Sequence, residues 1–363
     1  MQILGLMSGS SLDGLDIACC EMNWAENGQL KWSIVAAQTK PYSTEWEARL
    51  RALPQQNALI FAKTHTYLGR YFAELANSFL AEHPYCQPAY IASHGHTIFH
   101  EPTRFMTIQI GDGAALAALT GIPTICDFRT QDIALGGEGT PLAPLADKYL
   151  FEGYDFYMNI GGIANVSCNL NTHFIAFDIA PANQLLNFLA NQLNLPFDTD
   201  GKIAAEGNIC QDLLADLNKV EYFERKYPKS LDNTWIQEVF FPIFRNKNRT
   251  ISDCLATTVE CIAIQVQKSI QEIARKNNFS TQNKKIFITG GGALNKYLIA
   301  RIKHYLNSLG ITVFLPDTTI IQFKEASLLA LVGFLRLHEM PNSWKTVTGA
   351  KKDTINGAIY YTK

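Results

Sequence analysis

The stretch Gly5-Leu6-Met7-Ser8-Gly9-Ser10-Ser11-Leu12-Asp13-Gly14 joins two apolar segments that are typical of β-strands. Glycine permits positive φ and lets a ligand approach the backbone closely. The successive N–H groups of such a turn, with the hydroxyls of Ser8, Ser10 and Ser11, can bind an anion. Asp13 would repel a phosphate directly, but it suits a Mg²⁺ ion or the waters around one. The alternative is an ordinary hairpin in which Ser and Asp are turn formers.

Two further glycine clusters occur later in the chain. Asn159-Ile160-Gly161-Gly162-Ile163-Ala164-Asn165-Val166-Ser167 again lies between two predicted strands. Thr289-Gly290-Gly291-Gly292-Ala293-Leu294-Asn295 follows a buried strand and opens a predicted helix, whose free N–H groups favour a phosphate or a closely packed base. Neither GxxxxGK[ST] nor GxGxxG occurs, which argues against P-loop and Rossmann chemistry. Three such clusters are harder to explain as loop formers than a single turn.

The composition is that of an ordinary globular protein. The chain has 363 residues, 47% of them hydrophobic and 18% charged, a length that suggests two domains. Lys and Arg total 31 against 33 Asp and Glu, which gives a net charge of −2. This balance argues against a dedicated nucleic-acid binder and against a polyacidic disordered chain.

The cysteines and the start of the chain point to a reducing compartment. Eight cysteines without a CxxC pair are too dilute for a disulfide scaffold. The first residues lack the basic and apolar regions of a secretory signal, and no apolar run reaches the roughly 18–20 residues that cross a bilayer. We therefore expect a cytoplasmic protein with no membrane partner.

The order of predicted elements repeats once. A plan of strand, glycine turn, strand, strand and then helices begins at residue 1 and again near residue 154. The sequence predicts an α/β protein with two related domains, 1–152 and 153–363, flanking a cleft where small ligands bind. Whether the final helix, 323–340, packs back on the first domain is left open.

The predicted elements alternate along the chain. Strands are expected at Met1–Leu6, Leu15–Met22, Trp32–Thr39, Tyr90–Ser93, Thr107–Ile110, Pro123–Cys126, Phe156–Ile160, Asn165–Leu170, Phe174–Asp178, Lys285–Thr289 and Thr312–Leu315. Helices are expected from Asn57 to about Ala81, over Ala114–Thr120 and Leu142–Phe151, from Pro181, from about Ser252 to Asn278, up to Ser308, and from Phe323 to about His338.

The three glycine segments resemble the nucleotide-binding scaffold shared by actin, the heat-shock ATPase chaperones and sugar kinases. From residue 3 to about residue 358 the chain is similar to one group of these, the anhydro-N-acetylmuramic acid kinase family. The segments that carry this resemblance are Gly5–Gly14, Ser93–Thr97, Gln109–Gly113, Asp127–Arg129, Asp132–Leu142, Asn159–Asn165, Pro228–Ser230, Gly290–Gly292, Lys324–Ala326 and Val347–Ala350.

The resemblance implies a kinase with an added hydrolysis. Such enzymes open the 1,6-anhydro ring with water and transfer the γ-phosphoryl group of ATP to O6, which gives N-acetylmuramic acid 6-phosphate. The family's catalytic segment D-T-G-P-G-N reads here as Asp178-Ile179-Ala180-Pro181-Ala182-Asn183. A carboxylate is a suitable general base for the attacking water. The alternative for Asp178 is a helix N-cap.

The resemblance also implies where ATP, Mg²⁺ and the amino sugar bind, and that the protein is a homodimer. The residues expected to hold the phosphates are Gly9, Ser10, Ser11, Leu12, Asp13, Gly14, Gly161, Gly162 and Asn165, with Mg²⁺ bound through water at Asp13. The adenosine is expected against Gly290, Gly291, Gly292 and Asn295, and the sugar against His94, Arg129, Asn183 and Glu325.

Two of these sugar contacts have simpler explanations. Arg129 suits the lactyl carboxylate of a muramic substrate, but it could equally form a surface salt bridge with Asp127 or Asp132. Glu325 is also favoured at a helix start by the helix dipole alone.

Some positions depart from the family pattern. Ile179, Ala180 and Ala182 replace Thr, Gly and Gly beside the expected base, and a small shift there can reduce the rate greatly. His96 replaces Gln and could carry charge near pH 6–7. The alternative functions are a kinase of a different amino sugar and a chaperone-like ATP-binding protein.

A cluster of three histidines suggests a possible metal site. His94, His96 and His100 could hold a metal, although Gly95 and its β-branched neighbours favour a strand over the helix of a zinc motif.

Overall fold

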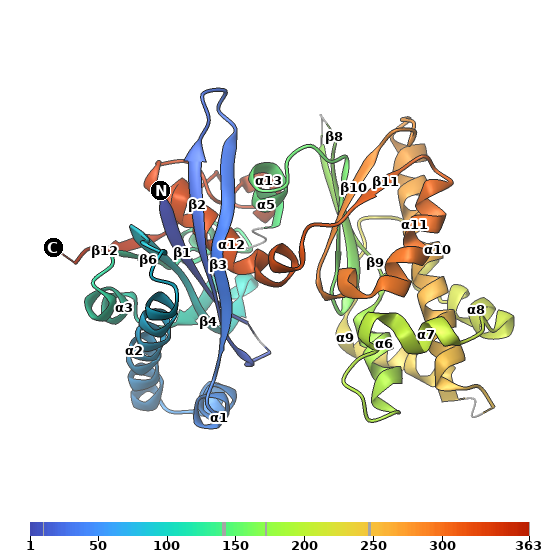
Figure 1. Cartoon of the computed structure of the whole chain (residues 1–363), viewed down its shortest axis with the longest axis horizontal. Coiled ribbons are helices and arrows are strands. Elements are labelled where there is room, and N and C mark those ends of the chain that lie inside the picture. The colour runs from blue at the N-terminus through green and yellow to red at the C-terminus, as the bar shows by residue number, and fades with distance from the viewer. Residues whose placement is uncertain (10, 140–142, 171–172, 246–247, 363) are drawn as a thin grey trace. The chain divides into compact units, whose positions relative to one another are not determined.

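The computed structural model describes residues 1–9, 11–139, 143–170, 173–245 and 248–362 (Figure 1). The chain divides into two compact units. Unit 1 contains Met1–Glu152 and Phe323–Lys363, and unit 2 contains Gly153–Gln322. The second unit is thus shorter than the domain predicted over residues 153–363, because the end of the chain groups with the first unit.

Unit 1 is built on a mixed sheet in the order β12-β6-β4-β1-β2-β3, with β5 paired to β4. The hairpin β1–β2 and the pair β2–β3 are antiparallel, whereas β4 runs parallel to β1 and to β6. The strands are β1 (Gln2–Ser8), β2 (Gly14–Trp24), β3 (Leu30–Pro41), β4 (Tyr90–Glu101), β5 (Met106–Ile110), β6 (Thr124–Cys126) and β12 (Ala358–Tyr360).

The long helix of unit 1, α2, packs one apolar stripe into the core. Asn57 caps it by accepting a hydrogen bond from the Ile60 N–H, and its buried residues include Leu68, Phe72 and Phe79. The helices of unit 1 are α1 (Thr44–Ala52), α2 (Ala58–Glu82), α3 (Gly113–Thr120), α4 (Thr130–Ala134), α5 (Ala143–Tyr149), α13 (Lys345–Thr348) and most of α12 (Thr318–Leu337). A short 3₁₀ helix follows α1 at Leu53–Gln55, and another follows β4 at Pro102–Arg104.

Helix α12 explains why the end of the chain belongs to unit 1. A Cβ built on Gly5 of β1 would lie 1.9 Å from the carbonyl oxygen of Ala326, so only glycine lets this strand and helix approach so closely. The helix begins at Thr318 rather than at the predicted Phe323. Phe323 itself has non-helical angles (φ −108°, ψ 20°), and this kink coincides with the division between the units.

Unit 2 repeats the strand plan of unit 1. Its sheet has the order β11-β10-β7-β8-β9, in which β7–β8 and β8–β9 are antiparallel and β10 runs parallel to β7 and β11. The predicted fold class, two α/β units that each begin with a strand–turn–strand hairpin, is confirmed. The strands are β7 (Phe156–Ile160), β8 (Ile163–Leu170), β9 (His173–Pro181), β10 (Lys285–Thr289) and β11 (Thr312–Phe314).

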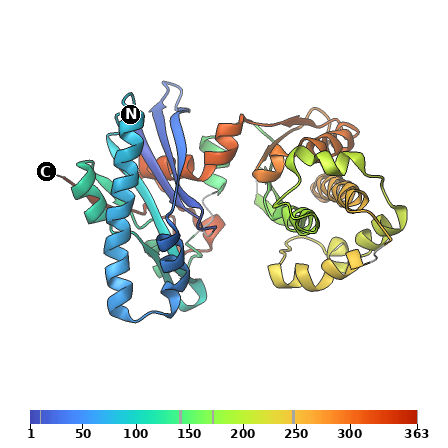
Figure 2. The ribbon, with the colours of Figure 1, turned by 60° about the horizontal axis from the view of Figure 1, so that its bottom comes forward.

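Helix α10 forms the centre of the helical layer of unit 2 (Figure 2). Thr250 caps it by accepting from the Asp253 N–H, and buried residues lie along most of its length. The helices are α6 (Asn183–Asn191), α7 (Lys202–Glu206), α8 (Gln211–Asn218), α9 (Asn233–Val239), α10 (Ile251–Lys276) and α11 (Lys296–Asn307). Short 3₁₀ helices cover Thr199–Gly201, Glu221–Glu224, Phe241–Arg245 and Gly291–Leu294.

Two predicted boundaries are wrong in ways that affect the site. Pro181 is the last residue of β9, and α6 begins only at Asn183, so the proline does not occupy the first helical position. Strand β4 extends to Glu101 because its outer half pairs with β5. His94, His96 and His100 therefore all lie on a strand.

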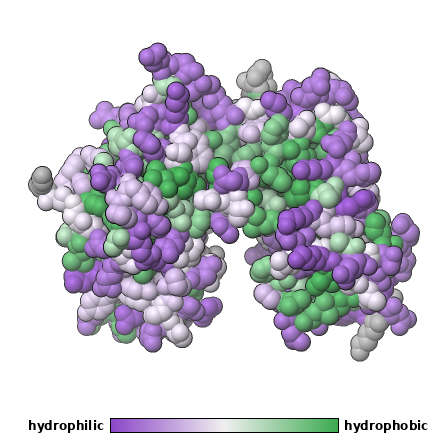
Figure 3. All heavy atoms as spheres, viewed as in Figure 1, coloured by the Kyte–Doolittle hydropathy of each residue, from purple (hydrophilic) through white to green (hydrophobic). Residues whose placement is uncertain are grey.

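Part of the surface of unit 2 is apolar. After α6, Leu193, Leu195 and Phe197 are exposed, and Figure 3 shows apolar side chains gathered on the surface of unit 2 near α6 and α7.

Among the helices that the structure describes, none combines the length and the apolar character needed to cross a bilayer.

Candidate functional site

The first glycine turn connects β1 to β2 in unit 1. Leu12 has a φ of +63°, and its N–H points to the Gly9 carbonyl oxygen at 3.4 Å. The Ser11 hydroxyl donates to Asp13 Oδ1 at 2.6 Å. Ser10 lies outside the described residues. The Ser11 hydroxyl thus holds the Asp13 carboxylate within the turn.

A buried chain of polar groups supports the start of this turn. The Tyr42 hydroxyl donates to Ser8 Oγ at 2.7 Å, and Ser8 Oγ lies 2.9 Å from His96 Nδ1. Burial raises the pKa of Tyr42 and lowers that of His96. Burial therefore disfavours the charge that His96 was expected to carry near pH 6–7, although a hydrogen bond to the Ser8 backbone opposes this effect.

His94 and Arg129 are buried polar groups with unused hydrogen-bonding atoms. His94 Nε2 and Arg129 Nε have no hydrogen-bond partner among the described residues. Burial, helped by the nearby Arg129 charge, lowers the pKa of His94 to about 3. Burial also lowers the pKa of Arg129 to about 10, against the opposing effect of Glu325. Buried polar atoms are rarely left unpaired, so this pair points to a ligand.

The salt-bridge alternative for Arg129 is not what the structure contains. Asp127 accepts a hydrogen bond from the Thr130 N–H, and Asp132 accepts from the hydroxyls of Ser343 and Thr348. Within the described ranges Arg129 forms no ion pair with either acid. Its guanidinium therefore remains available for an anionic group.

Carboxylates lie beside this cluster. Burial raises the pKa of Asp16, and the negative charges of Asp13 and Glu325 raise it further. Glu325 follows the kink of α12 and acts electrostatically on both Asp16 and Arg129. Asp16 thus interacts with the charges of Asp13 and Glu325, and Glu325 in turn interacts with Arg129, all within unit 1.

The second glycine turn connects β7 to β8 in unit 2, and the start of α6 docks on it. The N–H of Asn183 donates to the Gly161 carbonyl oxygen at 3.1 Å. The N–H of Ala182 donates to the Gly162 carbonyl oxygen at 2.8 Å. Asn165 lies two residues into β8, paired with Asn159 of β7. The turn is thereby tied to the segment that carries the expected catalytic motif.

The third glycine cluster packs against the second. Gly290 has a φ of +86°, and a Cβ there would lie 2.6 Å from the Ile160 carbonyl oxygen. A Cβ on Gly291 would lie 3.6 Å from Asn183 Nδ2. The glycines enter a 3₁₀ helix, and Asn295 then caps α11 by accepting from the Leu298 N–H at 2.9 Å. Both glycine turns of unit 2 therefore lie at one edge of its sheet.

Asp178 lies near the end of β9, in register with Asn165 of β8. Its Oδ2 accepts from the Leu231 N–H at 2.9 Å, and its carbonyl oxygen accepts from the Tyr222 hydroxyl at 2.7 Å. Burial raises its pKa above the usual value, although the Leu231 hydrogen bond opposes this. Oδ1 receives no hydrogen bond from the described part of the chain. Ala182, not Asp178, is the N-cap of α6, so the capping explanation is wrong.

The unusual residues beside Asp178 belong to the core. Ile179, Ala180 and Ala182 are all fully buried in the apolar cluster of unit 2. Their extra methyl groups contact the core, and they hold the backbone of the motif by packing. The carboxylate is positioned separately, by the Leu231 N–H, while the Tyr222 hydroxyl holds the backbone carbonyl of Asp178.

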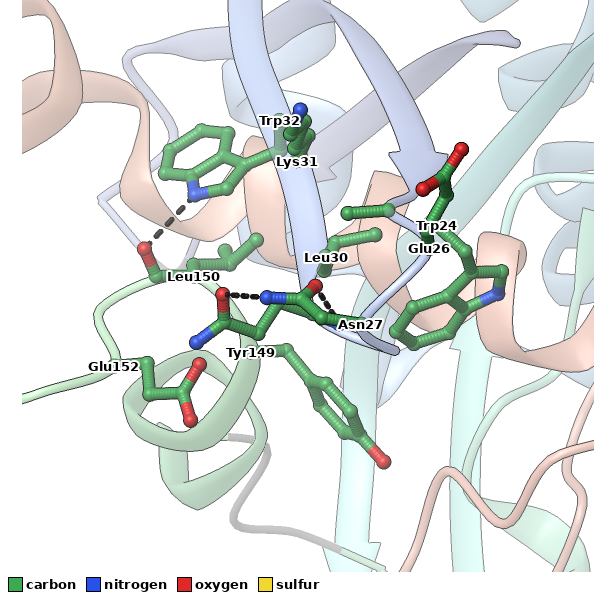
Figure 4. Close-up of a pocket in the computed structure, with 11 residues that line it drawn as sticks. Trp24, Glu26, Asn27, Leu30, Lys31, Trp32, Tyr149, Leu150 and Glu152 are labelled. Atoms are coloured by element: carbon green, nitrogen blue, oxygen red, sulfur yellow. Dashed lines mark hydrogen bonds between the residues drawn. The ribbon is translucent and has the colours of Figure 1, made fainter.

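A hollow in unit 1 lies apart from the predicted site residues. Within the described ranges, no three His, Cys, Asp or Glu side chains are arranged to hold a metal ion. An open hollow of about 900 Å³ lies where the β2–β3 hairpin meets the end of α5, between Trp24, Trp32 and Tyr149 (Figure 4). None of the predicted site residues lines it.

Sequence reasoning missed several residues of these clusters. Tyr42 and Asp16 lie beside the first turn, and Tyr222 and Leu231 orient Asp178. Asp16 could have been found, because it is the next acid after the turn on the strand that follows. Tyr222 and Leu231 give no local signal, since they reach Asp178 from a distant segment of the chain.

In both units the same order of strands begins with a strand–glycine turn–strand hairpin, and this arrangement defines a two-unit α/β protein. The family model for anhydro-N-acetylmuramic acid kinase matches residues 1–362, and the chain belongs to this family. It is therefore a kinase, an ATP-dependent phosphotransferase.

Curated relatives agree over nearly the whole chain. The chain is 33% identical to the anhydro-N-acetylmuramic acid kinase of Hydrogenovibrio crunogenus, over 99% of this chain and 97% of that protein. It is 34% identical to that of Coxiella burnetii, with the same two coverages. It is 32% identical to that of Microcystis aeruginosa, over 99% of this chain and all of that protein.

Proposed function

We propose that this kinase opens the 1,6-anhydro ring of anhydro-N-acetylmuramic acid with water and phosphorylates O6 at the expense of ATP. The product is N-acetylmuramic acid 6-phosphate, an intermediate in the recycling of cell-wall sugars. The observation that carries this proposal is the family match over residues 1–362. The relatives named for the same activity support it, since they match from end to end.

Asp178 is the proposed general base. Its Oδ2 is held by the Leu231 N–H, which leaves Oδ1 to take a proton from water. That water attacks the anomeric carbon and the bond from this carbon to O6 breaks. O6 then attacks the γ-phosphorus of ATP, the bond from this phosphorus to the bridging oxygen of the β-phosphate breaks, and ADP leaves. Burial raises the pKa of Asp178. A carboxylate with a raised pKa is a stronger base than an exposed one, provided that it is still ionised at the working pH.

The glycine turns are the proposed phosphate sites. Gly9 to Gly14 in unit 1 and Gly161 to Asn165 in unit 2 offer backbone N–H groups, which suit phosphate oxygens. Gly290 to Gly292 and Asn295 would lie against the adenosine. Mg²⁺, bound through water at Asp13, would neutralise charge on the transferred phosphoryl group.

The sugar contacts proposed are His94, Arg129, Asn183 and Glu325. The buried Arg129 Nε without a partner supports a carboxylate ligand, because a guanidinium pairs well with the planar lactyl carboxylate. Glu325 would accept from a sugar hydroxyl. A cytoplasmic location, where ATP is available, and a homodimer complete the proposal.

The experiment is product analysis with ATP, Mg²⁺ and anhydro-N-acetylmuramic acid in ¹⁸O-water. We expect one ¹⁸O in the anomeric hydroxyl and phosphate on O6. Asp178→Asn should reduce kcat by about 10²–10⁴-fold, the usual contribution of a general base. Asp212→Asn, an exposed acid of the same unit, is the matched control and should act as wild type.

The outcomes separate the alternatives. Full turnover by Asp178→Asn would remove Asp178 from the mechanism. Phosphorylation of a free amino sugar, without label from water, would identify a different sugar kinase. ATP hydrolysis stimulated by peptides but by no sugar would favour the chaperone-like protein.

A further inference from the structure

Tyr42, the residue directly after β3, contacts both ends of the first glycine turn. At the start of the turn, the Tyr42 hydroxyl donates to Ser8 Oγ at 2.7 Å. At the other end, the Tyr42 N–H donates to the Asp13 carbonyl oxygen, a longer contact of 3.4 Å. A single residue that is distant in sequence thus spans the turn between β1 and β2.

Strand pairing brings Tyr42 to this place. Gly14, the first residue of β2, is paired with Pro41, the last residue of β3. A Cβ built on Gly14 would lie 2.5 Å from the Lys40 carbonyl oxygen, so only glycine permits this close approach. The end of β3 therefore lies against the end of the turn, and Tyr42 follows directly.

The Tyr42 ring is held by helix α2. The side chain is 6% exposed, and its ring stacks on the Phe72 ring with the centres 6.4 Å apart. The Tyr71 ring lies against it at 5.9 Å. Burial raises the pKa of Tyr42, so the hydroxyl keeps its proton and remains a donor. The position of this hydroxyl is therefore set by α2 and not by the turn.

Ser8 passes this contact on to the turn, because it immediately precedes Gly9. Ser8 is 3% exposed, and its second polar neighbour is His96 of β4, whose Nδ1 lies 2.9 Å from Ser8 Oγ. A buried hydroxyl that loses a partner is destabilised. Loss of the Tyr42 hydroxyl would therefore weaken the hold on the residue from which the turn starts.

We propose that Tyr42 is a positioning residue that holds the first glycine turn in the conformation that binds the phosphates of ATP. Glycine has many accessible backbone conformations, and a site that is in its binding conformation for only part of the time binds its ligand more weakly by that fraction. The ligand of the turn rests on the proposed function. The contacts of Tyr42 all lie within unit 1.

Tyr42→Phe tests the proposal, because it removes the hydroxyl and keeps the ring and the backbone N–H. We expect the Kd of Mg-ATP, measured by calorimetry without sugar, to rise about fivefold, as for a turn that is in its binding conformation about one fifth of the time. The KM for ATP should rise by the same factor, while the KM for the sugar stays within about twofold of wild type.

Tyr71→Phe is the matched control. Tyr71 lies beside Tyr42, and its hydroxyl accepts from the Ser43 N–H at 3.3 Å instead of contacting the turn. This variant loses a comparable hydrogen bond, but its Kd for Mg-ATP should equal that of wild type. An equal rise of Kd in both variants overturns the proposal, because a general loss of packing would affect both.

A double variant tests whether Tyr42 acts through Ser8. Ser8→Ala removes the acceptor of the Tyr42 hydroxyl. Adding Tyr42→Phe to Ser8→Ala should therefore change the Kd for Mg-ATP by less than about twofold. A further fivefold rise overturns the proposed route through Ser8.

Hydrogen exchange of the protein without ligand keeps the test independent of the proposed function. Tyr42→Phe should speed exchange about threefold or more in the peptide that spans Leu6 to Leu15, and Tyr71→Phe should not. Unchanged exchange in Tyr42→Phe overturns the positioning of the turn, whatever the Kd. Faster exchange with an unchanged Kd supports the positioning and contradicts the phosphate site of the proposed function.

Discussion

At the scale of single residues, burial has two different effects on the polar groups of this protein. Around Asp178, burial raises the pKa of the carboxyl that we propose as the general base, and one backbone N–H orients it. Around His94 and Arg129, burial keeps an imidazole neutral and leaves unpaired atoms for a ligand. Both arrangements cost stability, because a buried polar group without a full set of partners is unfavourable.

The raised pKa of Asp178 predicts a pH effect on stability. A carboxyl with a raised pKa binds more protons in the folded state than in the unfolded state, so stability falls as pH rises from the unfolded pKa through the folded one. Asp178→Asn removes this cost, so its free energy of unfolding at pH 7 should exceed that of wild type. The difference should shrink toward pH 3.8, the ordinary value for Asp. Urea unfolding at several pH values measures it, and a less stable variant at pH 7 would contradict the prediction.

At the scale of elements, each glycine turn is held by a neighbour that is distant in sequence. The N-terminus of α6 docks on the Gly161–Gly162 turn, and the turn after β10 packs on the end of β7. Sheet order produces both contacts, since β10 pairs with β7 in parallel. The glycines thus serve packing between elements as well as any ligand.

This packing predicts unequal effects of adding one methyl group. Gly290→Ala combines a positive φ with a Cβ 2.6 Å from the Ile160 carbonyl oxygen, so we expect a loss of roughly 2 kcal/mol or more in unfolding free energy. Gly291→Ala meets only Asn183 Nδ2 at 3.6 Å, an ordinary contact, and should lose less than about 1 kcal/mol. Denaturant unfolding of both variants decides this. Equal losses would show that the close approach does not constrain the turn.

At the scale of the whole molecule, two units carry one strand plan and belong to a single kinase chain. The chain leaves unit 1 after Glu152 and returns at Phe323, where α12 is kinked. The close contact between Gly5 and Ala326 ties the returning segment to the first strand. Each unit therefore has its own core and its own glycine turn.

Nucleotide binding should stabilise the molecule by mass action. At ATP concentrations about 100-fold above Kd, the added stability is about 2.7 kcal/mol, which raises Tm measurably. We expect a larger rise with Mg²⁺ than with EDTA, and Asp13→Asn should reduce the difference. Asp16→Asn provides the comparison, because this neighbouring acid has no proposed metal role. Identical shifts with Mg²⁺ and EDTA would contradict a magnesium site. Differential scanning fluorimetry is sufficient for this test.

Local patterns in the sequence determined the α/β class, the repeated hairpins and most elements. Strand β10 and helix α2 follow directly from apolar runs and spacings, because short-range patterning decides such segments. The glycine turns and Asp178 were also visible, since their motifs are continuous in sequence. The extension of β4 and the end of β9 at Pro181 were not visible in the sequence. Pairing with β5 decides the first and pairing with β8 decides the second.

Only the tertiary structure decided which distant groups meet. Tyr42 reaches Ser8, Leu231 reaches Asp178, and Glu325 returns to the cluster of Arg129 through the packing of α12 on β1. These contacts join segments far apart in the chain, where no local spacing records them. Hydrogen-bond partners and pKa values depend on such long-range contacts, whereas strands and turns depend on the residues beside them.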